Sequence, residues 1–253
     1  MMKGWPYVLN FQGFDSFFLS WFYCIFARLI KATCGLKKIL FICMFLLSVF
    51  SMRAGEVDVE KPADAFATWT DVIIRKDYNN WHIGGLIEYC TINKGQGLKS
   101  NEFTLRPIVG YNPLPWLRLQ FQVDFLHSLY GDTQFYIRYI PDVTFHWSAS
   151  DFRFSVRNRI QMSQNITKRK YSSTAVRNRF KVDYLVPKAP VTVHLAAEPY
   201  WWSDGFIKTR YYLGADFKLN KQLSLTADYI RYQHYKPGTP DQNVVVLALN
   251  IRL

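Results

Sequence analysis

In two neighbouring segments, residues 152–161 and 176–184, apolar and polar side chains alternate along the chain. In both, apolar residues occupy most alternate positions, and Arg, Lys, Ser, Gln or Asp occupies the positions between them. A period of two is the mark of a β-strand whose two faces meet different surroundings. Residues 165–174 are polar and basic, as in a hairpin loop. The pattern therefore predicts an antiparallel pair of strands with one apolar face and one charged face.

The same alternation recurs from residue 66 to the end of the chain. It marks about eleven segments of roughly 9 to 11 residues, the length that a tilted membrane strand needs. The segments are 66–75, 81–93, 103–111, 117–125, 134–147, 152–161, 176–184, 191–201, 211–219, 223–229 and 244–253. Longer polar connections near residues 94, 166, 204 and 238 alternate with shorter ones near 113, 149, 188 and 221. Strands joined in this way are typical of an up-and-down barrel.

We therefore predict an all-β fold, a closed antiparallel transmembrane β-barrel of about 10 to 12 strands that follows an N-terminal signal peptide. If both ends of the barrel lie in the periplasm, the strand number must be even. Two arrangements satisfy this condition. In the favoured one, residues 55–62 add a short twelfth strand. In the other, residues 66–75 stay outside a ten-stranded barrel.

The first 54 residues have a different character. Lys37 and Lys38 precede an apolar run at 39–50, and the exit segment Ser51-Met52-Arg53-Ala54 ends in a small residue, as in a secretory signal peptide. Three of the four cysteines lie in this part, so Cys90 would be alone after cleavage and could form no disulfide framework or cysteine metal cluster. We interpret the chain as a mis-started or upstream extension (1–36), a signal peptide (37–54), a polar lead-in (55–65) and a barrel (66–253).

Alternation alone leaves open which face of the barrel points outward. A soluble, lipocalin-like barrel would enclose the apolar face, whereas a membrane barrel would turn it toward lipid. On the order of fifty large apolar side chains is more than a small soluble barrel encloses, which favours the membrane orientation. After residue 54 no apolar run is long enough for a transmembrane helix, so strands would have to cross the membrane.

Aromatic residues gather near the ends of the predicted strands, as in the interfacial girdles of membrane barrels. Those near the shorter turns are Trp81, Tyr111, Trp116 and Trp147, and those near the longer loops are Tyr130, Tyr171, Tyr200, Trp201, Trp202 and Tyr235. With the signal peptide, they predict a protein of the outer membrane of a Gram-negative bacterium. The expected partners are outer-membrane lipid with its lipopolysaccharide and the barrel-assembly machinery.

Several segments resemble a family of small bacterial outer-membrane barrels, of Bacteroidetes type, that is known as a domain of unknown function. They are Trp69, Trp81, Arg157-Asn158-Arg159, Arg177-Asn178-Arg179, Ala197-Glu198-Pro199-Tyr200 and Arg210 to Leu219 with Asn220-Lys221. The resemblance covers most of residues 66–253. It implies the barrel fold and a location in the outer membrane, but it implies no particular activity. Many outer-membrane barrels end in Phe, whereas this chain ends in Leu253.

Charged residues dominate the proposed inner face, and the chain carries a formal net charge of +12. The predicted lumen-lining network consists of Arg118, Asp124, Arg138, Asp142, Arg153, Arg157, Arg159, Arg177, Arg179, Lys181, Asp183, Glu198, Arg210 and Asp216. Further charges on this face are Arg106, Lys218, Arg252, Glu88 and Asp228. Because an unpaired buried charge is very costly, the favoured interpretation is a filled, structural barrel in which these charges pair. Asp183 is an expected partner of the Arg-rich strands.

Two other functions stay open. The excess of basic residues could line a narrow water-filled channel that selects anions, with an acidic sugar or another small anion as the solute. A membrane-embedded lipid hydrolase is the second alternative, but His127 and Ser128 are adjacent and so point to opposite faces of a strand. His194 and Glu198 share a face but lie about 13 Å apart along a strand. We therefore expect no enzyme.

Neither a cofactor nor a nucleic acid is expected as a partner. The five histidines show no metal-ligand spacing, so no metal site is expected either. Basic residues are spread through strands of alternating polarity instead of forming one nucleic-acid-binding patch. The basic run Lys168-Arg169-Lys170 lies in a predicted loop, where it could meet lipid phosphates or stay solvated.

Overall fold

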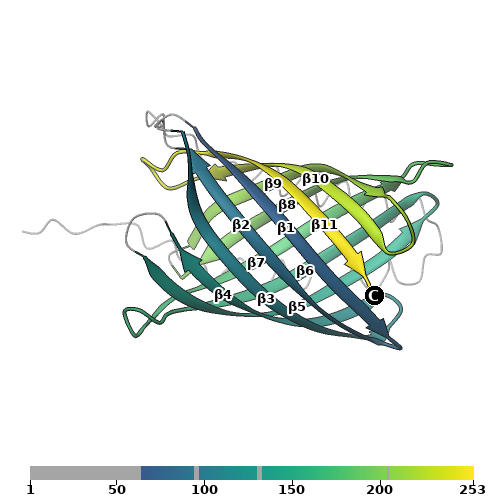
Figure 1. Cartoon of the computed structure of the whole chain (residues 1–253), viewed down its shortest axis with the longest axis horizontal. Helices are drawn as coiled ribbons and strands as arrows, with labels where there is room; N and C mark the ends of the chain where they lie inside the picture. The colour runs from purple at the N-terminus through teal and green to yellow at the C-terminus, as the bar shows by residue number, and fades with distance from the viewer. Residues whose placement is uncertain (1–63, 94–96, 130–132, 204) are drawn as a thin grey trace, which may run out of the picture. The chain divides into compact units, whose positions relative to one another are not determined.

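The computed structural model describes residues 64–93, 97–129, 133–203 and 205–253, which form an all-β barrel (Figure 1). Its strands are β1 (Ala65–Tyr78), β2 (Trp81–Asn93), β3 (Leu98–Leu114), β4 (Leu117–Ser128), β5 (Gln134–Ala149), β6 (Phe152–Asn165), β7 (Lys170–Leu185), β8 (Val191–Trp202), β9 (Gly205–Lys218), β10 (Leu223–His234) and β11 (Gln242–Arg252). Among the described residues, no helix has the length and apolarity needed to cross a membrane. The all-β class and the closed barrel of 10 to 12 strands are confirmed.

The interpretations of the N-terminal part stay predictions. The upstream extension (1–36), the signal peptide (37–54) and the lead-in up to residue 63 lie outside the described residues, as does Tyr130. β1 begins at Ala65, one position before the expected start of the barrel at residue 66.

The first and last strands close the barrel by pairing in parallel (Figure 1). Their register runs from Ala65 opposite Gln242 to Arg75 opposite Arg252. All other pairings are antiparallel. The expectation of an even strand number, with twelve favoured, is therefore wrong, and so is a purely antiparallel barrel. Eleven up-and-down strands leave the first and the last running in the same direction, so closure has to be parallel.

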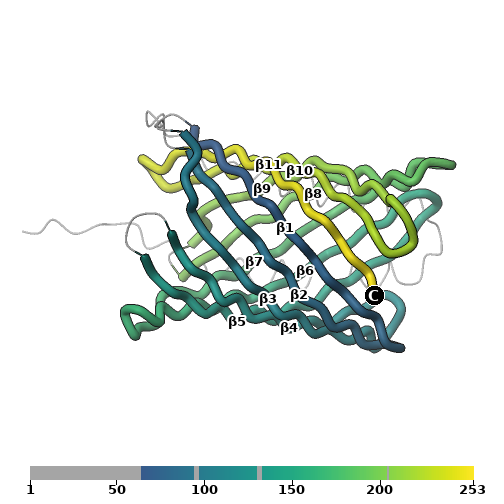
Figure 2. Tube along the Cα trace, viewed as in Figure 1, coloured from purple at the N-terminus to yellow at the C-terminus, as the bar shows by residue number. Residues whose placement is uncertain are grey.

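The two rims of the barrel carry different connections (Figure 2). The turn rim carries residues 79–80, 115–116, 150–151, 186–190 and 219–222, and the other, which we call the loop rim, joins β2 to β3, β4 to β5, β6 to β7, β8 to β9 and β10 to β11. Asn79 and Ser150 adopt positive φ angles of 50° and 52°, as tight hairpin turns require. The strands have 11 to 17 residues, more than expected, because ladders continue into segments such as 170–174 that alternation assigned to loops.

The barrel turns its apolar face outward. Large outer side chains such as Ile83 (61% exposed), Leu195 (59%) and Leu213 (53%) are open to the surroundings. Acidic side chains of the opposite parity are enclosed, with Asp124 at 1% and Glu198 at 0%. This is the reverse of a lipocalin-like barrel. The inner face also holds one apolar cluster beside the seam between β1 and β11, made of Ala67, Ile230, Tyr232, Val244 and Val246.

Candidate functional site: a charge network in the lumen

The carboxylate of Glu198 on β8 is the centre of the network. It accepts hydrogen bonds from Arg157 Nη2 at 2.7 Å and from Arg177 Nη2 at 3.1 and 3.2 Å. The Tyr212 hydroxyl donates to Oε2 at 2.6 Å, and Arg210 Nη1 lies 3.9 Å from the same oxygen. These donors come from β6, β7 and β9, so one acid connects four strands. Because every donor points at one enclosed carboxylate, the charge of Glu198 is well compensated.

Aromatic rings also stabilise the basic side chains, which outnumber the carboxylates in this part of the lumen. The Arg210 guanidinium lies 4.3 Å from the ring centre of Tyr232 and 4.7 Å from that of Tyr200. Lys208 Nζ lies 5.0 and 5.1 Å from the same two rings. A cation over an aromatic face is attracted by the ring quadrupole, and more strongly when water is excluded. The prediction that Tyr200 belongs to an outer girdle is wrong, because its parity is that of Glu198 and its side chain is 3% exposed.

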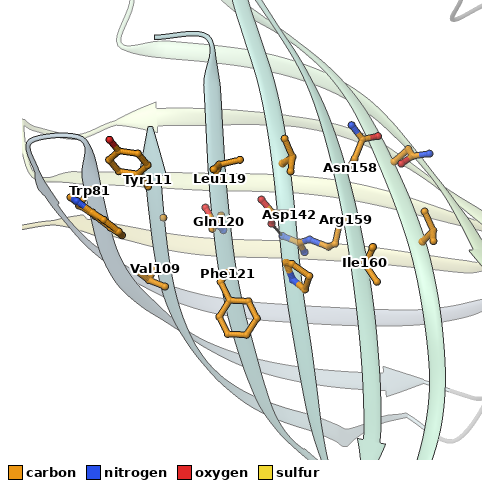
Figure 3. Close-up of a pocket in the computed structure, with 15 residues that line it drawn as sticks. Trp81, Val109, Tyr111, Leu119, Gln120, Phe121, Asp142, Asn158, Arg159 and Ile160 are labelled. Atoms are coloured by element: carbon orange, nitrogen blue, oxygen red, sulfur yellow. Dashed lines mark hydrogen bonds and ion pairs between the residues drawn. The ribbon is translucent and has the colours of Figure 1, made fainter. Parts of the chain in front are cut away.

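Two further acids accept hydrogen bonds from separate groups of donors on the inner face. Asp142 accepts hydrogen bonds from Arg159 Nη2 at 2.7 Å and from Gln122 Nε2 at 2.9 Å. In Figure 3 the side chains of Asp142 and Arg159 point toward one another from neighbouring strands. Asp124 on β4 binds Arg106 in a bidentate pair at 2.5 and 3.0 Å, with Arg138 at 4.0 Å. Both acids are almost fully buried.

Toward the turn rim the pairs are more open. His194 Nε2 and Asp228 Oδ1 are 2.7 Å apart, and His194 Nδ1 lies 3.5 Å from Asp216. Asp183 pairs with Lys181 at 2.9 Å and with Arg153 at 3.9 Å. Half of the Arg153 side chain is exposed, so water enters this end.

Three prolines interrupt the strand ladders beside the buried acids. Pro107, Pro141 and Pro199 lie inside β3, β5 and β8. At each one the regular pairing with a neighbour lapses, between β3 and β4, β5 and β6, and β7 and β8 respectively. Proline has no N–H group to donate to a ladder, so an interruption is required there. Asp142 and Glu198 directly adjoin two of the prolines, and the Arg106–Asp124 pair flanks the third.

The structure places every predicted network residue on the inner face, but not always with the expected partner. Arg118 donates to Asn112 Oδ1 at 3.1 Å, and Arg179 lies 5.9 Å from the ring centre of Tyr212. Asp183 was expected to serve the Arg-rich strands. It pairs with Arg153 and Lys181, whereas Arg157, Arg159 and Arg177 bind Glu198 and Asp142.

Some members of the network were not predicted. They are Trp69, Tyr200, Lys208, Tyr212 and Tyr232. Strand parity carried the signal for most of them, because Lys208 and Tyr212 fall on the same face as Arg210. Of the aromatic members, Tyr200 was assigned to a girdle, as lipid-facing aromatic residues in membrane barrels are, and Trp69, Tyr212 and Tyr232 were given no role in the lumen.

The outer wall contains a shallow hollow of about 660 Å³ over β2 to β7 (Figure 3). Apolar side chains such as Leu119, Phe121 and Ile160 line it. Asn158 and Asn178, direct cross-strand partners, bring amides into this otherwise apolar lining, and within the described residues neither amide has a hydrogen-bonding partner. These two residues place polar side chains in the middle of the outer face of β6 and β7.

Two histidines, His127 and His194, bear on the question of a catalytic or metal-binding site. His127 stacks on Phe135 with ring centres 4.1 Å apart, and His194 is held by two aspartates. No group of three or more His, Cys, Asp or Glu side chains placed to hold a metal ion occurs in the part of the chain that the structure describes. The absence of an enzyme activity remains a prediction.

The sequence of this barrel matches a known protein family. Residues 66–244 match the family described as Protein of unknown function (DUF2490). The chain belongs to this family. The match to DUF2490 extends from β1 into β11 and includes the whole Glu198 network, and it confirms the resemblance to an uncharacterised family. No curated protein matches the chain. DUF2490 carries no assigned activity, so function has to be argued from the lumen and the outer wall.

Proposed function

We propose that this DUF2490 protein is an integral outer-membrane barrel with a filled lumen, and that it serves the membrane as a closed structural barrel. The observation that carries the proposal is the enclosed Glu198 network inside a wall whose outer face is apolar. Outer-membrane lipid with its lipopolysaccharide would surround the wall. The barrel-assembly machinery would insert it.

The outer wall supports the membrane part of the proposal. In water, its exposed apolar surface would be unfavourable by about 25 cal/mol for each Å². Large contiguous apolar surfaces on soluble proteins mark interaction sites or membrane contacts. Here such residues recur on strand after strand, for example Ile87, Phe125, Leu213 and Leu247. A closed barrel also pairs its backbone groups around the whole wall, which is the condition for strands to lie in hydrocarbon.

The buried bases favour a filled lumen over an anion channel. A channel that selects anions needs arginines that face water and are free to meet the solute. The side chains of Arg159 and Arg177 are only 5% and 9% exposed, and both donate to buried carboxylates. Narrow barrels are commonly filled by their own side chains. A small anionic solute that crosses the lumen therefore belongs to the less favoured alternative.

Ion flux through the reconstituted barrel tests the proposal. Vesicles that carry the folded protein and a trapped chloride-sensitive dye should retain their chloride gradient as well as empty vesicles do, because the ion pairs fill the lumen. Flotation of the same vesicles on a density gradient shows that the protein is inserted, and an open porin in matched vesicles is the positive control. Rapid, anion-selective leakage from vesicles that carry the inserted protein would establish the channel instead.

A further inference from the structure

The turn-rim mouth of the lumen contains a pocket of about 640 Å³. Its lining comes from β1 and from β6 to β11, together with the turns at 186–190 and 219–222. Five bases contribute to it, Arg75, Arg153, Lys218, Lys221 and Arg252, whereas Asp216 is the one acid among the described lining residues. The pocket therefore combines a bounded volume with a strong excess of positive charge.

Three of these five bases form no ion pair with any carboxylate that the structure describes. Within the described residues, no ion pair joins Arg75, Lys218 or Lys221 to a carboxylate. The one lining acid, Asp216, is already engaged, because Thr226 donates to it at 2.5 Å and His194 lies 3.5 Å away. An external anion would supply the missing negative charge.

The register of the strands arranges several donors around the same space. Arg75 and Arg252 are direct partners across the parallel seam, so two like charges lie side by side. Like charges directly opposite one another destabilise a strand pair unless a counter-charge lies between them. Asp77 forms its ion pair with Arg252, with Oδ2 3.0 Å from Nε, and attracts Arg75 only at longer range. Across β9, β10 and β11, Lys218, Ser224 and Asn250 form one cross-strand row and add an ammonium, a hydroxyl and an amide.

We infer that this pocket is a binding site for a small polyvalent oxyanion. Guanidinium forks match the oxygens of phosphate and carboxylate groups, and lysine adds a mobile point charge. A volume of about 640 Å³ exceeds the need of a single phosphate and accommodates a molecule with two or more anionic groups. The enclosed Glu198 network lies further inside, so the pocket holds its ligand and does not pass it through. The inference rests on the proposed function only for the compartment that the pocket faces. Short turns of outer-membrane barrels face the periplasm, so the ligand would be a periplasmic anion.

Calorimetric titration of the full chain in a non-ionic detergent tests the site. Pyrophosphate and citrate are the two probes, which separate phosphate from carboxylate recognition, and chloride at equal ionic strength is the reference. At least one probe should bind with one molecule per barrel. Replacing Arg75 and Lys218 by Gln together should weaken that binding at least tenfold, because both bases lie in the pocket and neither forms an ion pair with a described carboxylate.

Two further variants keep the test decisive. Lys218→Gln with Lys221→Gln changes two exposed bases of the same pocket, and it should also weaken binding if the first variant folds poorly. Lys168→Gln with Lys170→Gln removes the same charge at the loop rim and should leave binding unchanged. The inference fails if neither probe binds, or if the loop-rim variant loses as much affinity as the pocket variants. If the vesicles retain their chloride gradient but neither probe binds in the titration, the anion site is rejected and the proposal of a filled barrel is unaffected.

Discussion

Replacing Glu198 by Gln is expected to lower the free energy of unfolding by about 3–5 kcal/mol. The amide keeps the shape of the side chain but removes the charge that compensates Arg157, Arg177 and Arg210. Those cations would remain enclosed, because they come from three different strands and their side chains are at most 16% exposed. Urea unfolding in lipid vesicles, followed by tryptophan fluorescence, measures the loss.

Glu102→Gln is the matched control for this prediction. Glu102 is a half-buried glutamate on the inner side of β3, and within the described residues it makes no ion pair. Its replacement should change the free energy of unfolding by less than about 0.5 kcal/mol, as is usual away from buried networks. If Glu198→Gln were tolerated as well as the control, the arginines around Glu198 would have to be hydrated, as in an open lumen.

Leu247→Arg should lower the stability of the membrane-inserted barrel by about 2–4 kcal/mol. Leu247 lies midway along β11 on the outer face and is 50% exposed. A charge at this depth would face hydrocarbon if the wall lies in a bilayer. In water the same exposed position would accept Arg within about 0.5 kcal/mol. The variant therefore shows whether the middle of the outer wall faces hydrocarbon or water.

Leu219→Arg controls for the substitution itself. Leu219 is 60% exposed in the turn between β9 and β10, where a membrane protein meets the interface. Arg near the interface is expected to lower stability by about 0–1 kcal/mol. Unfolding in vesicles compares both variants with the unmodified chain. Equal tolerance of Arg at the two positions would show that the middle of the wall meets water.

Strand parity predicted much of the fold and of the site, because it is a local signal. The segments 152–161 and 176–184 form a cross-strand pair that lies within β6 and β7, and their charged side chains lie inside as expected. Which partners those charges choose depends on distances across several strands. Arg157 reaches Glu198 past the intervening strand β7, and no pattern within β6 indicates this.

The strand number and the seam could not be read from alternation. Residues 244–249 of β11 are all apolar, so this strand shows no polar face that would fix its neighbour. Closure between β1 and β11 joins the most distant strands of the chain, and only the barrel as a whole determines it. The inner aromatic residues were missed for a related reason. An alternation pattern reports which face a side chain takes, and a Tyr such as Tyr200 is compatible with either a girdle or a cation-lined lumen.

Extraction of the protein from membranes tests the central claim, that the apolar outer wall faces lipid, most directly. Cells of a Gram-negative host that express the full chain are separated into soluble, inner-membrane and outer-membrane fractions, and the membranes are washed with carbonate. The proposed barrel should remain in the outer-membrane fraction, require detergent for release and migrate more slowly on a gel after boiling than before it. Recovery of the folded protein in the soluble fraction without detergent would contradict the claim.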